Sequence, residues 1–177
     1  VTTAPFISLR RHALLVHAML ALAIAGPAGL RAAEQPHSFN EKTSAAFTKL
    51  KPLQETKDWD GMLKVLEEIK PTTDPKSYDM AQILDMEAKL YGQKEQYTKS
   101  IDAWDEALKM SEGTDFFSAQ QKSDMLLYLA QFSYQEGTAS KDPAVLHTYI
   151  NKAAGYFKRY LADAKNPSPD IEMFYAN

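Results

Sequence analysis

The hydrophobic positions of this 177-residue chain repeat with helical spacing over most of its length. Residues 97–108 read Tyr-x2-Ser-Ile-x2-Trp-x2-Ala-Leu, and residues 59–69, 38 positions earlier, read Trp-x2-Met-Leu-x2-Leu-x2-Ile. Apolar residues three and four apart form one face of an α-helix. Self-similarity at a period of about 20–50 residues is typical of stacked-helix arrays. Such arrays usually serve as binding surfaces.

The first half of the chain predicts three helices. One begins near Glu41, and Pro52 within it predicts that it is bent or short. The second follows Asp58, a good N-cap residue, and ends at residues 71–75, which contain two prolines. The third begins after Ser77 or Asp79 and ends in a tight turn at residues 92–93.

The second half predicts three more helices. The fourth helix starts near Tyr97 and ends at Gly113. For the fifth we expect a cap at Thr114 or Asp115, a course through Phe116 and Phe117 to about Glu136, and a loop over residues 137–142. The sixth opens at Asp142-Pro143, since proline favours the first helical position, and ends at Asn166-Pro167.

No stretch alternates with the period of a strand, so the fold class predicted is all-α, built of antiparallel helix pairs. The units are residues 41–75, 76–113 and 114–166 of a helical domain spanning 41–177. Residues 170–177 read as the start of a further helix. Its apolar side chains would lack packing partners if the protein stopped there, and we therefore expect the chain to continue.

The unit around residues 84–108 resembles a tetratricopeptide repeat. The resemblance is carried by Leu84, Ala88, Tyr91, Tyr97, Ser100, Trp104 and Ala107. Small residues in this set let two helices cross closely, while the aromatic residues fill the space beside the crossing. Residues 46–69 look like a degenerate unit, and residues 126–161 like a stretched one. The resemblance implies a tetratricopeptide-like α-solenoid that binds proteins, similar to exported bacterial scaffolds of envelope assembly and uptake complexes.

Residues 1–33 have the order of a secretory signal peptide. Arg10-Arg11 precede an apolar run over residues 13–25, and small residues end the segment at Ala32-Ala33. The run is shorter than the roughly 20 residues needed to cross a bilayer. Residues 34–40 form a polar linker. We expect an exported, periplasmic or secreted protein, with an uncleaved anchor as the alternative.

Composition narrows the function classes. The chain has no cysteine, which excludes disulfides and thiolate chemistry. Residues 1–33 carry three arginines and no acid, leaving 17 basic and 23 acidic residues after them, a net charge of −6. A mildly acidic body argues against nucleic acid or an anionic membrane as partner.

The sequence gives little support for a catalytic site or a metal site. Six carboxylates cluster on two predicted helices: Asp79, Asp85, Glu87, Asp102, Asp105 and Glu106. Paired carboxylates can serve acid–base catalysis, but interspersed lysines favour a solvated face with pairs such as Asp85–Lys89 and Asp105–Lys109. Outside the leader the histidines are His37 and His147, which read as surface residues. We therefore expect no enzyme activity, metal or cofactor.

The favoured hypothesis is a scaffold that binds another protein or peptide. Its first helices would line the concave groove, as the resemblance implies, through Gln82, Lys89, Gln120, Asp124, Tyr128 and Gln131. Tyr156 is a further aromatic candidate for this groove. One alternative is a helical docking domain of a larger envelope enzyme or uptake-system accessory protein, completed by sequence beyond residue 177. Another is a purely structural helical domain.

Overall fold

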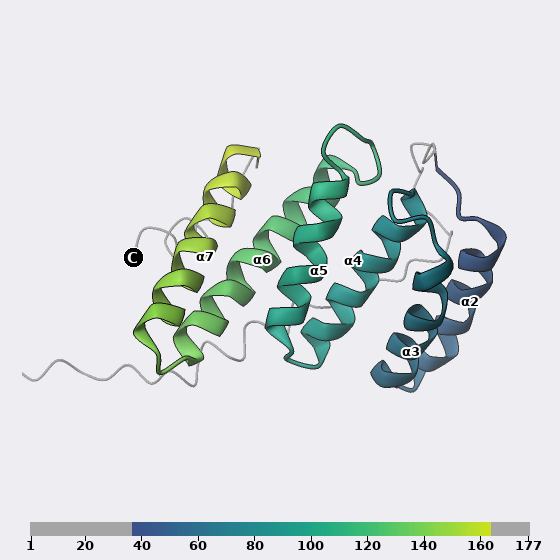
Figure 1. Cartoon of the computed structure of the whole chain (residues 1–177), viewed down its shortest axis with the longest axis horizontal. Helices are drawn as coiled ribbons and strands as arrows, with labels where there is room; N and C mark the ends of the chain where they lie inside the picture. The colour runs from purple at the N-terminus through teal and green to yellow at the C-terminus, as the bar shows by residue number, and fades with distance from the viewer. Residues whose placement is uncertain (1–36, 164–177) are drawn as a thin grey trace, which may run out of the picture. The chain divides into compact units, whose positions relative to one another are not determined.

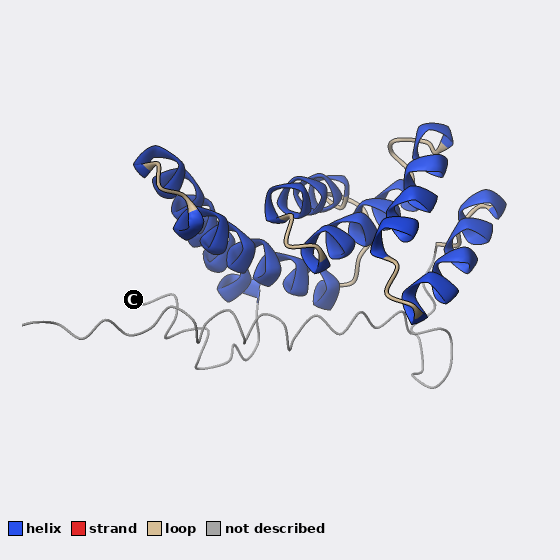
Figure 2. Cartoon of the chain, turned by 90° about the horizontal axis from the view of Figure 1, so that it is seen from below, coloured by secondary structure: helices blue, strands red, loops and turns tan. Residues whose placement is uncertain are grey.

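A computed structural model describes residues 37–163, and these form six α-helices and a short 3₁₀ helix, in chain order across the view of Figure 1. Their bounds are α2 Glu41–Glu55, α3 Trp59–Ile69, η2 Lys70–Thr72, α4 Tyr78–Gln93, α5 Tyr97–Met110, α6 Ala119–Ala139 and α7 Pro143–Asp163. The described residues contain no strand (Figure 2), so the predicted all-α class is confirmed for this part of the chain. The signal peptide predicted for residues 1–33, the start of the predicted linker and the helix expected at residues 170–177 lie outside the described residues.

Helix starts follow the local capping signals. The side chains of Asp58 and Ser77 accept hydrogen bonds from backbone amides of α3 and α4, and Asn40 does the same for α2. These bonds satisfy amides that the first helical turn leaves unpaired. Asp142 likewise accepts from the Ala144 amide at the start of α7. α2 continues past Pro52 to Glu55 and is 15 residues long.

The start of α6 differs from the prediction. Neither Thr114 nor Asp115 caps it; Ser118 does, in a capping box with Gln121. The Ser118 hydroxyl accepts from the Gln121 amide at 3.2 Å, and the Gln121 side chain accepts from the Ser118 amide at 2.8 Å. A reciprocal pair satisfies two amides, which a single cap cannot do. Phe116 and Phe117 therefore lie in the segment before the helix. Phe117 is buried there.

Two glycine predictions are also corrected. Gly137 was expected in a loop, but it is buried inside α6, which runs on to Ala139. A Cβ added there would lie 3.1 Å from Tyr149 Cβ, so the absent side chain lets α7 approach α6. The turn after α4 lies beyond Gly92, at Glu95, whose φ of 56° is in the left-handed region.

Consecutive helices pack against each other throughout the described residues. Contacts are most extensive between α6 and α7 and between α4 and α5, and sparsest between α3 and α4. α4 is the central element, with buried residues on nearly all sides. Where α4 meets α5, Ala88, Ser100 and Ala107 have no exposed surface, and the Ser100 hydroxyl donates to the Ala88 carbonyl at 2.7 Å. Small side chains thus bring the two backbones close.

Alternate helices also make contact. The Tyr156 hydroxyl of α7 donates to the Asp105 carboxylate of α5, 2.6 Å from either oxygen. The Gln82 amide of α4 donates at 3.1 Å to the carbonyl of Phe116, which precedes α6. α7 is therefore tied to α5, and α4 to the segment before α6, in addition to the contacts between neighbouring helices.

Candidate functional site

The carboxylates of α4 are not a solvated face, and that prediction was wrong. Asp79, Asp85 and Glu87 are only 5, 5 and 3% exposed. Each has a partner: Asp79 accepts from the Asn40 amide at 3.1 Å, Asp85 pairs with Lys89, and Glu87 with Lys70. Buried carboxylates persist only when paired in this way. Their role in the described residues is to join segments to α4.

Asp85 joins the two helices of the central pair, α4 and α5. Its Oδ1 accepts from the Trp104 indole at 2.9 Å, and its Oδ2 accepts from Lys89 Nζ at 2.6 Å, the i,i+4 pair that was predicted. The Trp104 ring stacks on Tyr128 of α6, with ring centres 5.3 Å apart. Asp85, Trp104 and Tyr128 thus connect α4, α5 and α6 through one hydrogen bond and one ring stack.

The predicted groove residues lie on two of these helices. Gln120, Asp124, Tyr128 and Gln131 form a stripe along α6, and Gln82 and Lys89 lie on α4. We call these six residues the α4–α6 face. Their polar groups already have partners in several places, since Gln120 donates to Asp124 at 2.8 Å and Gln82 holds the Phe116 carbonyl. Tyr128 is half-buried, and burial, with a smaller effect of Asp124, raises its pKa.

Tyr156, the other groove candidate, does not reach this face. It is 8% exposed, and its hydroxyl is held by Asp105. Burial, and then the hydrogen bond to that carboxylate, raise the pKa of Tyr156 well above the ordinary value of a tyrosine. This bond to Asp105 differs from the Asp105–Lys109 pair expected from the sequence. Tyr156 is a packing residue between α7 and α5.

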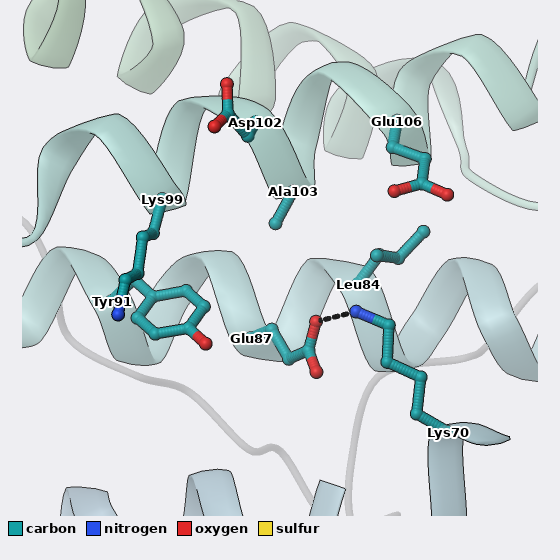
Figure 3. Close-up of a pocket in the computed structure, with 8 residues that line it drawn as sticks. All are labelled: Lys70, Leu84, Glu87, Tyr91, Lys99, Asp102, Ala103 and Glu106. Atoms are coloured by element: carbon teal, nitrogen blue, oxygen red, sulfur yellow. Dashed lines mark hydrogen bonds and ion pairs between the residues drawn. The ribbon is translucent and has the colours of Figure 1, made fainter. Parts of the chain in front are cut away.

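A pocket of about 220 Å³, which helical spacing alone does not predict, lies on the other side of α4. Figure 3 shows it between α4 and α5, with the Lys70 side chain entering from η2. Its lining residues are Lys70, Leu84, Glu87, Tyr91, Lys99, Asp102, Ala103 and Glu106. Leu84, Glu87 and Tyr91 occupy i, i+3 and i+7 on α4, a helical stripe that the sequence contains, but Lys70 comes from another element.

The charges around the pocket are unevenly paired. Lys70 Nζ lies 2.5 Å from Glu87 Oε2, and Lys99 Nζ lies 5.2 Å from the centre of the Tyr91 ring. Burial raises the pKa of Tyr91, and the negative charges of Glu87 and Glu67 raise it further. Asp102 and Glu106 are exposed and make no ion pair within the described residues.

His37 is more enclosed than a linker histidine was expected to be. Its ring stacks on Tyr78 at 5.1 Å and meets the edge of Phe116 at 5.2 Å. Its Nε2 lies 2.5 Å from Asp115 Oδ1. This hydrogen bond is the main reason that the pKa of Asp115 is lowered. His37 therefore fastens the segment before α2 to the loop before α6.

His147 is exposed on α7, as expected, with Nδ1 3.0 Å from the Asn151 amide nitrogen. Across residues 37–163 no three His, Asp or Glu side chains come together as metal ligands would. None of the helices described there combines the length and apolar character required to cross a membrane. Comparison with protein-family models, curated proteins and solved structures gave no significant match to this chain.

Proposed function

We propose that this chain is a tetratricopeptide-like helical-repeat scaffold that binds another protein outside the cytoplasm and has no catalytic activity of its own. The carrying observation is the contact between the alternate helices α7 and α5, where Tyr156 donates to Asp105, supported by the bond from Gln82 of α4 to the Phe116 carbonyl just before α6. Helix pairs stacked as repeats make such contacts because corresponding helices of successive units lie side by side. The small residues at the α4–α5 crossing agree with this arrangement.

The α4–α6 face is the proposed binding surface. In a stack of helix pairs the first helices lie on one side of the stack, and in the second and third units these are α4 and α6. The stripe on α6 combines amides, a carboxylate and a half-buried tyrosine whose ring is backed by Trp104. A rigid aromatic ring with one polar end is favoured in protein contact surfaces.

Binding accounts for the polar chemistry of α4 better than catalysis does. Asp85 uses both oxygens, one on Trp104 and one on Lys89, and Glu87 holds Lys70. A general base needs a carboxylate that is able to reach a substrate proton. These carboxylates are occupied in fastening α4 to α5 and to η2.

Position-specific photo-crosslinking in native cells tests this function. With p-benzoylphenylalanine in place of Gln131, we expect one discrete crosslinked species, reduced at least about fivefold by Tyr128→Ala, since interface aromatics often dominate binding energy. The matched control places the crosslinker at Lys158, an exposed position of α7. The same species from both positions, or no species from either Gln131 or Gln120, would contradict the proposal.

The proposed location rests on residues 1–33 and has its own test. We expect the mature chain to begin near Glu34 and to be recovered from the periplasm or medium, as shown by N-terminal mass spectrometry after fractionation. A full-length chain found only in the cytoplasm would contradict export while leaving the binding proposal intact.

A further inference from the structure

We infer that the pocket between α4 and α5 receives an arginine side chain from a basic segment of the partner protein. This inference rests on the proposed binding function and adds the chemistry of one partner residue. The pocket lies on the side of α4 that carries Leu84, Glu87 and Tyr91, whereas Gln82 and Lys89 belong to the α4–α6 face. It is therefore a second contact, separate from that face.

The size of the pocket suits a single side chain. About 220 Å³ is below the roughly 300–1,000 Å³ of sites for small-molecule ligands. The buried side chains of Leu84 and Ala103 form the bottom of the pocket, and the half-buried Tyr91 ring forms one wall (Figure 3). An arginine side chain presents an apolar stem and a planar cationic head, which match an apolar floor beside an aromatic ring.

The Tyr91 ring already accepts a cation. Lys99 Nζ lies 5.2 Å from its centre, within the range of a cation–π interaction. The lysine is exposed and makes no ion pair within the described residues, so an incoming guanidinium is able to replace it. Arginine is more weakly hydrated than lysine and stacks on aromatic faces, which favours it for this position.

The surrounding charge also selects a cation. Glu87 neutralises Lys70. The lining holds two exposed carboxylates of α5, Asp102 and Glu106, against the single charge of Lys99. Glu106 points toward Leu84, and Asp102 lies at the outer edge (Figure 3). Glu67 adds negative charge near Tyr91. The pocket therefore has an excess of negative charge, as does the body of the chain. Carboxylates without an ion-pair partner can make bidentate hydrogen bonds to a guanidinium.

The test is a titration of the full chain, labelled with ¹⁵N, with N-acetyl-arginine methylamide. We expect saturable shifts of the Tyr91, Asp102 and Glu106 amide signals. N-acetyl-citrulline methylamide, which has nearly the same shape and no charge, should give none. The double variant Asp102→Asn/Glu106→Gln should bind the arginine probe at least about fivefold more weakly, since charge-assisted hydrogen bonds are roughly twice as strong as neutral ones.

Two further variants distinguish binding of the probe in the pocket from non-specific attraction of a cation to an acidic protein. Tyr91→Leu removes the ring and should also weaken the arginine probe, whereas Tyr91→Phe keeps the ring and should not. The matched control, Glu41→Gln/Glu55→Gln, removes two exposed carboxylates from α2 and should bind as the wild type does. Each variant is first checked for an unchanged pattern of amide signals elsewhere.

Equal shifts with the arginine and citrulline probes, or unchanged binding by Asp102→Asn/Glu106→Gln, would overturn the inference. Such a failure together with a specific crosslink at Gln131 leaves the scaffold proposal standing. Arginine binding without any crosslink from the α4–α6 face would reject the proposed binding surface and retain the pocket.

Discussion

The indole Nε1 of Trp104 donates a hydrogen bond to Oδ1 of Asp85 across 2.9 Å, which joins α5 to α4 at a fully buried tryptophan. The other oxygen of Asp85 holds Lys89 at 2.6 Å. A buried indole N–H needs an acceptor, and a buried carboxylate needs donors, so each group satisfies the other. The same tryptophan supports Tyr128 on the α4–α6 face, which links stability of the helix pair to the proposed binding surface.

Asp85→Ala should lower the free energy of unfolding by about 2–4 kcal/mol, because it leaves the buried Trp104 N–H without an acceptor. Asp85→Asn keeps an oxygen acceptor and should cost about 1–2 kcal/mol. Urea unfolding followed by circular dichroism measures both. Glu68→Ala, an exposed change on α3, should stay within about 0.5 kcal/mol of the wild type. Equal stability of Asp85→Ala and Glu68→Ala would show that the Trp104 bond contributes nothing.

Two glycines inside helices should respond oppositely to alanine. Around Gly155 of α7 no atom lies within 4 Å of an added Cβ, so Gly155→Ala should stabilise the protein by about 0.5–1 kcal/mol through helix propensity. At Gly137 of α6 the Cβ would lie 3.1 Å from Tyr149 Cβ and 3.3 Å from the Leu146 carbonyl oxygen. Overpacking typically costs about 1–3 kcal/mol.

We therefore expect Gly137→Ala to be less stable than Gly155→Ala by at least about 1 kcal/mol. Thermal and urea unfolding of the two variants side by side provide the measurement. Both changes add one methyl group to a helical glycine, buried against α7 at Gly137 and exposed at Gly155, so the difference in stability reports the contact between α6 and α7. Equal gains at both positions would mean that α7 packs less closely on Gly137.

Tyr156→Phe removes the hydroxyl that α7 donates to Asp105 and keeps the ring. Hydrogen bonds to charged groups are worth about 1.5–3 kcal/mol, and the lower part of that range is expected because Asp105 is partly exposed. Tyr160→Phe on the same helix is the control and should have little effect. If Tyr156→Phe matched that control in urea unfolding, the link between α5 and α7 would be energetically unimportant.

The same bond has a pH signature. The pKa of Tyr156 is raised above 10.0 in the folded protein, so its contribution is fully present below that value and is lost as the pH rises beyond it. The stability difference between wild type and Tyr156→Phe should be constant near neutral pH and should shrink above about pH 10. A difference that grew in alkali would contradict the assigned hydrogen bond.

Asp115 should titrate below its ordinary pKa of 3.8, chiefly because His37 donates a hydrogen bond to its carboxylate. A depressed carboxyl pKa contributes stability above the ordinary value, and that contribution is lost as the pH falls through the folded pKa. Carboxyl carbon NMR measures the titration directly. In His37→Ala the pKa of Asp115 should rise toward 3.8, whereas His147→Ala should leave it unchanged.

Local signals explain what the sequence predicts well. Helical periodicity identifies the all-α class, and Asp58 is a cap as expected because a cap bonds to an amide three residues away. Of the two candidates for the start of α4, Ser77 is the cap and Asp79 lies inside the helix. The cap of α6 was missed because Thr114 and Asp115 are equally good cap residues, and only the partner Gln121 distinguishes Ser118. Gly137 was read as a helix breaker because its close contact with α7 is not a local property.

The sequence by itself determined the helices, their approximate ends and the small residues of the α4–α5 crossing, since each depends on neighbours within a turn or two of the chain. Tertiary structure decided which carboxylates are buried. Glu87 meets Lys70 from 17 residues away, and Asp85 meets Trp104 from 19. It also brought Tyr156 to Asp105 and formed the pocket beside Tyr91. These features require separate helices to pack, and helical spacing alone does not specify which faces will meet.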